Sequence, residues 1–190
     1  MAPGAFCFSP MSDATVLMTA QMMHRALARI AHEIAERNEE SRQVILAGVP
    51  RGGVLLARRL AKLLEGIWHH PVPAGTLDVS MHRDDLDQQI APMVHQTELP
   101  GDINGRTVVL VDDVLCSGRT ARAALDAIHD FGRPRRIQFA VLIDRGHREL
   151  PIKPDFVGKN VPTSRHERVD VRFSEEHGED AVRLKRTQPL

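Results

Sequence analysis

Two adjacent acidic residues, Asp112 and Asp113, stand shortly before the polar turn 117–120, which reads Ser-Gly-Arg-Thr. Adjacent carboxylates accept hydrogen bonds from the vicinal hydroxyls of a ribose and help to orient a hydrated Mg2+. A turn that leads into a helix offers backbone N–H groups and the positive end of the helix dipole, which together bind a phosphate. The spacing therefore predicts a site for a sugar phosphate, with Mg2+ as cofactor.

Each half of this pattern has an ordinary structural explanation, because Asp caps turns and Gly permits a positive φ. The whole string of residues 108–120, VVLVDDVLCSGRT, is far more specific. It resembles the signature with which type I phosphoribosyltransferases bind 5-phosphoribosyl pyrophosphate (PRPP). The resemblance implies that residues 108–120 bind PRPP.

A second glycine loop, Pro-Arg-Gly-Gly at residues 50–53, follows an apolar run. Its small residues let backbone amides approach a pyrophosphate, and Arg51 adds a positive charge. Taken alone, the loop is nearly as typical of a tight turn with a solvated arginine. The pyrophosphate required by the first motif favours the functional interpretation, with Arg51, Gly52 and Gly53 as PRPP ligands.

The elements that must position these motifs alternate between strand and helix. Apolar runs predict strands at residues 44–49, 74–80, 107–111 and 137–143, with weaker strands near residue 156 and at 169–173. Helical periodicity predicts helices at residues 19–38, 54–64 and 120–131. This order predicts an α/β fold with a mainly parallel sheet, helices on both faces, and ligand loops at the carboxyl ends of the strands.

Composition limits the classes of function. Lys plus Arg balance Asp plus Glu at 25 each in 190 residues, so binding to RNA or a membrane would need a local patch. Two cysteines and the lack of a long apolar run favour a soluble, cytoplasmic protein without a membrane partner. We expect residues 1–18 to form a disordered leader and residues 19–190 a single domain.

Several segments carry a wider resemblance, which runs from about residue 25 to residue 167. They are RALARIAHEIAERN, HRDDL, the acid-pair motif and AVLIDRGHRELPIKPDFVGKNVPTS. The chain resembles the bacterial pyrimidine operon attenuator family, whose members double as uracil phosphoribosyltransferases. The resemblance implies a type I phosphoribosyltransferase fold with a small C-terminal hood, a mobile loop over the active site, and a homodimer or higher oligomer.

The resemblance also assigns roles to single residues. Asp112 and Asp113 would hold the ribose and the metal, Arg83 would arrive with the mobile loop as a catalytic residue, and uracil would lie near Arg145. The 5-phosphate would be held by Ser117, Gly118, Arg119 and Thr120, and Cys116 belongs to the same PRPP-binding segment. Purine-specific relatives usually have an acid at the position of Cys116, so a thiol there favours a pyrimidine. The family more often reads Thr-Arg-Gly where this chain has residues 51–53, and has Tyr in place of His82 and Cys116.

Members of the family also bind a messenger RNA leader in a UMP-dependent way, through a basic face. The matching positions are Arg29, His32, Arg37, His147, Arg148, Lys153 and Lys159. Against this, the family's Thr is Ala28, and arginines on an amphipathic helix are commonly just solvated. Three hypotheses follow: a uracil phosphoribosyltransferase that regulates pyrimidine-operon RNA, a transferase for another base, and an RNA-binding regulator whose nucleotide site is only a sensor.

Overall fold

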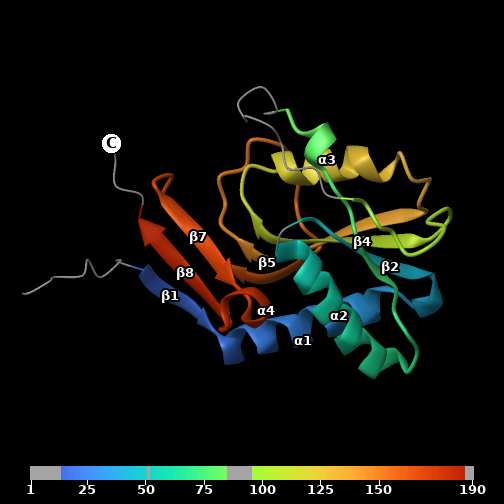
Figure 1. Cartoon of the computed structure of the whole chain (residues 1–190), viewed down its shortest axis with the longest axis horizontal. Helices are drawn as coiled ribbons and strands as arrows, with labels where there is room; N and C mark the ends of the chain where they lie inside the picture. Colours follow the sequence, from blue (N-terminus) through green and yellow to red (C-terminus); the bar gives the residue numbers. More distant parts are fainter. Residues whose placement is uncertain (1–13, 51, 85–95, 187–190) are drawn as a thin grey trace, which may run out of the picture.

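A five-stranded parallel sheet forms the centre of the protein, with strand order β3-β2-β4-β5-β6 (Figure 1). This is a computed structural model, and it describes residues 14–50, 52–84 and 96–186. The strands are β2 (Val44–Gly48), β3 (Ala74–Thr76), β4 (Thr107–Leu115), β5 (Arg136–Asp144) and β6 (Phe156–Asn160). Every ladder between neighbours in this sheet is parallel, which confirms the mainly parallel sheet predicted from the sequence.

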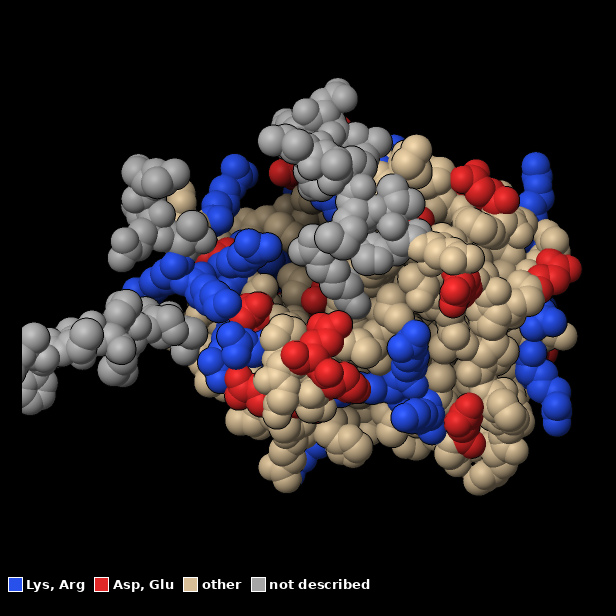
Figure 2. All heavy atoms as spheres, in the orientation of Figure 1, with Lys and Arg blue, Asp and Glu red and all other residues tan. Residues whose placement is uncertain are grey.

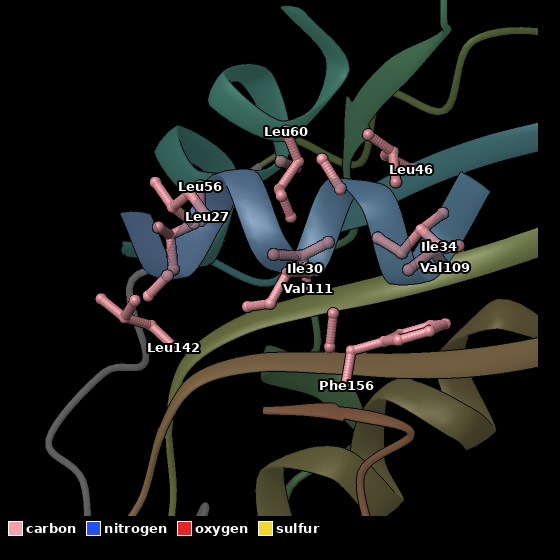
Figure 3. Packing of buried hydrophobic residues seen from close by; sticks show 14 of the residues in the cluster. Leu27, Ile30, Ile34, Leu46, Leu56, Leu60, Val109, Val111, Leu142 and Phe156 are labelled. Carbon is pink, nitrogen blue, oxygen red and sulfur yellow. The ribbon is translucent and has the colours of Figure 1, made fainter. Parts of the chain in front are cut away.

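Helices cover both faces of this sheet (Figure 1). Helices α1 (Ala20–Arg37) and α2 (Gly52–Trp68) pack on one face, and α3 (Arg119–Ile128) packs on the other. Successive strand residues point to opposite faces, so Leu46 and Val109 meet α1 and α2 while Ile45 and Val108 face α3. Figure 3 shows Leu27, Ile30 and Ile34 of α1 in the same packed cluster as Val109 and Val111 of β4. Burial on both faces explains why the strands read as continuous apolar runs.

A second, antiparallel sheet with strand order β1-β8-β7 forms the hood. It consists of β1 (Ala14–Thr19), β7 (Glu167–Arg172) and β8 (Ala181–Arg186), with the short helix α4 (Ser174–His177) between β7 and β8. The sequence predicts a hood of late-chain residues, whereas the structure adds the early strand β1. The predicted disordered leader is therefore wrong for residues 14–18, which pair with β8 and bury Met18. Residues 1–13 lie outside the described residues.

Several element boundaries differ from the prediction, including both ends of α2, which was expected at residues 54–64. Strand β4 continues to Leu115 because its ladder with β5 extends that far, so the acid pair belongs to the strand rather than to the following loop. Strand β3 ends at Thr76, and a 3-10 turn (Ser80–His82) follows where a longer strand was expected. Helix α3 ends before the expected residue 131. The structure also has a 3-10 turn at Ser41–Gln43. Of the predicted mobile loop, residues 85–95 lie outside the described part of the chain.

Candidate active site

The acid pair lies at the carboxyl end of β4, at the edge of the sheet where parallel α/β proteins bind ligands. Asp112 is 7% exposed, and its Oδ1 accepts a hydrogen bond from the backbone N–H of Asp113 at 2.9 Å. Asp113 is partly exposed and its Oδ1 accepts from the N–H of Val114 at 2.8 Å. Both carboxylates are thus fixed by the backbone that follows them.

Burial, and then the neighbouring charge of Asp113, raise the pKa of Asp112 well above its usual range. The positive charge of Arg83 acts in the opposite direction on this pKa, which places the arginine within electrostatic reach of Asp112. A buried acid with an acidic neighbour is unfavourable in isolation, and such arrangements are concentrated at functional sites. The arrangement suits a ligand that brings hydroxyl donors and a cation.

The predicted phosphate loop joins β4 to α3. Gly118 has φ +93° at the N-cap of α3, a left-handed conformation that favours glycine, and Ser117 Oγ accepts from the N–H of Arg119 at 3.4 Å. The first turn of α3 therefore presents its N–H groups beyond the end of β4. The side chain of Arg119 pairs with Asp84 and, at 2.8 Å, with Glu149. The Cys116 thiol is free and partly buried.

The second glycine loop passes directly beside the acid pair. A Cβ atom on Gly52 would lie 2.6 Å from Asp113 Oδ2, and one on Gly53 would lie 2.3 Å from the carbonyl oxygen of Val111. Only glycine permits such an approach, so the backbone of the loop can reach a ligand held at the end of β4. Arg51, the charged residue of this motif, lies outside the described residues.

The hood closes the site from the other side. A cleft of about 470 Å³ separates the loop at Gly52 and the carboxylate of Asp113 from β7, β8 and α4. Its hood lining consists of Arg168, Val169, Asp170, Val171, Phe173, Glu176, His177 and Lys185. The sequence did not single out these residues. Their only signal is the alternation within residues 167–172, which predicts a strand and not a binding surface.

Arg145, expected near the base, reaches the segment that leads into the hood. Its Nε donates to Thr163 Oγ1 at 3.0 Å and its Nη2 donates to the carbonyl of Ser164 at 3.1 Å. Its backbone N–H donates to the carbonyl of Leu115 at 3.0 Å. Arg145 thus links the segment that leads into the hood to the end of β4, and direct contact with a base stays a prediction.

The expected RNA-binding residues fall into two groups. The first group lies along α1 and β6. Arg29 donates to the carbonyls of Val157 at 3.0 Å and Gly158 at 2.5 Å. Arg37 pairs with Asp155 at 3.3 Å, and Lys159 donates to the carbonyl of a β1 residue. His32 and Lys153 are exposed. The structure therefore brings together α1 and β6 as a basic surface, although several of its cations already have partners within the chain.

The second group, His147 and Arg148, lies after β5 beside the phosphate loop. His147 Nε2 is 2.6 Å from the carbonyl oxygen of Thr163, and Arg148 pairs with Asp144 at 2.5 Å.

Figure 2 shows further Lys and Arg side chains over the surface where Figure 1 places β7 and β8. These cations have acidic partners nearby, in the pairs Arg172–Asp170, Arg183–Glu179, Lys185–Asp170 and Arg186–Glu167. The charge of the hood is thus largely balanced.

Comparison with known proteins agrees with this geometry. Residues 18–175 match the model of the phosphoribosyl transferase domain. The bifunctional protein PyrR of Roseiflexus sp. is 60% identical over 173 residues, which cover 90% of this chain and 94% of the relative. The bifunctional protein PyrR of Streptomyces coelicolor is 59% identical over 161 residues, which cover 84% of this chain and 83% of the relative. The chain belongs to the PyrR family.

This chain is also similar in structure to solved phosphoribosyltransferases outside the PyrR family. The hypoxanthine phosphoribosyltransferase of Trypanosoma cruzi superimposes with a TM-score of 0.69 at 18% identity, covering 92% of this chain and 97% of its own. A hypoxanthine-guanine phosphoribosyltransferase from Bacillus anthracis gives a TM-score of 0.69 at 16% identity, covering 90% and 97%. At such identity the likeness shows the fold alone. The expected type I phosphoribosyltransferase fold is confirmed.

Proposed function

We propose that this protein transfers the phosphoribosyl group of PRPP to uracil, forming UMP and pyrophosphate. The observation that carries the proposal is that three parts suited to PRPP lie at the carboxyl end of β4 in a member of the PyrR family. These parts are the acid pair at the end of β4, the N-terminus of α3, and the close glycine loop at Gly52. Each part suits a different group of PRPP.

In this proposal Asp112 and Asp113 accept hydrogen bonds from the ribose hydroxyls, and residues 117–120 hold the 5-phosphate. The backbone at Gly52 and Gly53 receives the pyrophosphate, with Arg51 beside it. Transfer passes through an oxocarbenium-like ribosyl centre, so the protein's task is to align PRPP with the base and to exclude water. Arg83 supplies positive charge next to the acid pair. No protein nucleophile is needed.

Mg2+ fits the oxygen donors of this site. Proteins commonly supply one or two carboxylates to Mg2+, and the remaining ligands are water and substrate phosphate. Within the described residues, no group of three or more His, Cys, Asp or Glu could hold a metal ion by itself. A cation would also offset the acidic neighbour that raises the pKa of Asp112. When bound, Mg2+ would neutralise charge on the pyrophosphate.

The choice of uracil rests on PyrR family membership and on Cys116, where purine-specific relatives usually have an acid. A direct test compares uracil, hypoxanthine, guanine and orotate as acceptors with PRPP and Mg2+. We expect turnover with uracil alone. Turnover with another base would point to a salvage enzyme of different specificity. PRPP or UMP binding without turnover on any base would favour a regulator that keeps the site as a sensor.

RNA binding is the second function. The basic residues along α1 and β6 support it, together with family membership. UMP in the cleft would favour binding of a pyrimidine-operon leader RNA. The test measures the affinity for such a leader and for a scrambled RNA of the same length, with UMP present. Equal affinities for the two RNAs would contradict the regulatory function, and the protein would then be a salvage enzyme alone.

We further expect the reaction to take place in the cytoplasm and the chain to form a homodimer or a higher oligomer. No helix in the described part of the chain is long and apolar enough to cross a membrane. Sedimentation measures the oligomeric state directly, and a monomer at micromolar concentration would contradict this expectation.

A further inference from the structure

The segment after β5 is bonded along the outer side of the phosphate loop. Leu115 and Asp144 are partners in the β4–β5 ladder, so the two loops leave the sheet side by side. The N–H of Arg145 donates to the carbonyl of Leu115 at 3.0 Å. The N–H groups of Glu149 and the residue after it donate to the carbonyl of Ser117 at 2.9 and 3.1 Å. The backbone of this segment therefore holds two carbonyls of the phosphate loop.

The carbonyl between them, that of Cys116, is held by a side chain. Arg148 Nη1 donates to it at 2.7 Å. Three consecutive carbonyls, those of residues 115, 116 and 117, are thus bonded to the segment after β5. In a planar trans peptide, the carbonyl of one residue and the N–H of the next point in opposite directions. Fixing the Cys116 carbonyl therefore turns the N–H of Ser117 away from Arg148 and toward the side where a phosphate would bind.

Arg148 is itself firmly held. Its Nη2 donates to Asp144 Oδ2 at 2.5 Å and its Nε donates to the carbonyl of Ile152 at 2.9 Å. The side chains of the pair are only 25% and 15% exposed. Asp144 Oδ1 accepts from the N–H of Gly146, so both carboxylate oxygens have partners. Each edge of the guanidinium has a defined acceptor, an arrangement that a lysine cannot reproduce.

The backbone before Arg148 supports the same conclusion. Gly146 and His147 adopt positive φ angles of +77° and +62°, and such a conformation is unfavourable for a residue other than glycine. The turn directs the next side chain back under the phosphate loop. The energetic cost of this turn indicates that the direction of the Arg148 side chain has a function.

We propose that Arg148 is a positioning residue of the phosphoribosyl site: it orients the Cys116–Ser117 peptide so that the N–H of Ser117 faces the 5-phosphate, without touching the ligand itself. This inference rests on the proposed function and deepens it. Arg148 also belongs to the basic residues expected to bind RNA. Its inward contacts make its effect on RNA indirect, through the affinity for UMP.

The test compares ligands with and without the 5-phosphate. Calorimetry measures the dissociation constants of UMP and uridine for wild-type protein and for Arg148→Gln. We expect the affinity for UMP to fall at least about tenfold, or about 1.4 kcal/mol, while that for uridine changes by less than about twofold. The KM for PRPP should rise, and the KM for uracil should stay near that of the wild type. Partial unfolding would lower the binding stoichiometry rather than change this ratio.

Two further variants sharpen the comparison. Asp144→Asn keeps the size of the side chain but removes the charge that holds Arg148, and it should show the same selective loss to a smaller degree. Arg135→Gln removes an ion-paired arginine just before β5, at the other end of that strand, where its partner Glu40 lies 2.9 Å away. This control should bind both ligands as the wild type does. An equal loss of UMP and uridine in Arg148→Gln would indicate general loosening and overturn the proposal.

A measurement of RNA binding provides an independent test of the proposal. With UMP at saturation, Arg148→Gln should bind leader RNA nearly as well as the wild type. Unchanged UMP affinity combined with weaker RNA binding at saturating UMP would show direct contact with RNA and refute the positioning role. Failure of the wild type to use uracil or to bind UMP would instead count against the proposed function.

Discussion

Arg59 of α2 connects the body of the protein to the turn that follows β7. Its guanidinium makes two hydrogen bonds to Asp180, at 2.8 and 3.0 Å, pairs with Glu175, and lies 5.3 Å from the ring centre of Phe173. The Arg59 side chain is 20% exposed and that of Asp180 is 22% exposed. Arg59→Met preserves much of the packing but removes the charged partner of Asp180, a largely buried carboxylate that keeps the hydrogen bond from the N–H of Ser174 at 2.8 Å.

The expected loss follows from these contacts. A hydrogen bond to a charged group contributes about 1.5–3 kcal/mol, and removing one partner of a desolvated pair costs more than removing an exposed one. Glu175 is 45% exposed, so solvent screens the ion pair and reduces the contribution of Glu175 to stability. We expect the free energy of unfolding to fall by about 2–4 kcal/mol, which for a chain of this size lowers the Tm by roughly 4–16 °C.

The pH dependence provides a second check. Hydrogen bonds from Arg59 lower the pKa of Glu175. Burial raises the pKa of Asp180, but the hydrogen bonds and charge of Arg59 outweigh it, so that this pKa is also lowered. Carboxylates of this kind add stability that is present above their unfolded pKa of about 4 and is lost as the pH falls through the folded value. The difference between wild type and Arg59→Met should therefore be full at pH 7 and shrink below about pH 4.

Thermal unfolding between pH 7 and pH 3 measures both effects. Arg58 is the matched control, because it is the exposed neighbour of Arg59 on the same helix, and Arg58→Met should change stability by less than about 0.5 kcal/mol. If the two variants had the same Tm at pH 7, or if the Arg59→Met difference grew on acidification, the reasoning about this ion-pair cluster would be refuted.

Three further predictions concern the site. Asp112→Asn should abolish PRPP binding in calorimetry yet raise the Tm of the free protein at pH 8, because burial and Asp113 raise the pKa of Asp112; the gain should shrink as the pH falls and vanish below about pH 3, where Asp112 is protonated in both the folded and the unfolded state. Gly52→Ala should reduce uracil transfer at least about tenfold, since its Cβ would lie 2.6 Å from Asp113 Oδ2; normal kcat/KM would contradict this packing. Arg29→Gln with Arg37→Gln should weaken leader RNA binding and flatten its salt dependence by about one unit per lost phosphate contact, so an unchanged slope would exclude these residues.

Much of the fold follows from local sequence. The strands β2, β4 and β5 are buried on both faces, so their apolar runs are unbroken, and the glycine loop at Gly52 and Gly53 marks a place where two parts of the chain approach closely. The acid pair and the turn at Gly118 are contiguous in sequence. Their joint location at one sheet edge was therefore predictable, and the family and the fold are confirmed.

The parts that escaped prediction depend on distant pairing. Residues 14–18 lack strong periodicity and become a strand only because β8 provides a partner. The hood lining carries mixed polar and apolar residues that look like an ordinary surface until the cleft is formed. The inward direction of Arg148 likewise depends on the turn at Gly146 and on Asp144, whereas the family resemblance placed this residue among those expected to bind RNA.

Strand β1 has a consequence for the order in which the protein is made. The ladder between β1 and β8 joins opposite ends of the described chain, and within the described residues the strand that pairs with β7 is β8. The phosphate loop and its supporting segment are close in sequence, so they can assemble while the polypeptide is still being synthesised. The hood cannot assemble this early, because β1 and β7 can pair only after β8 has left the ribosome. A nascent chain would therefore acquire its phosphate loop well before it has a wall against which a base could be held.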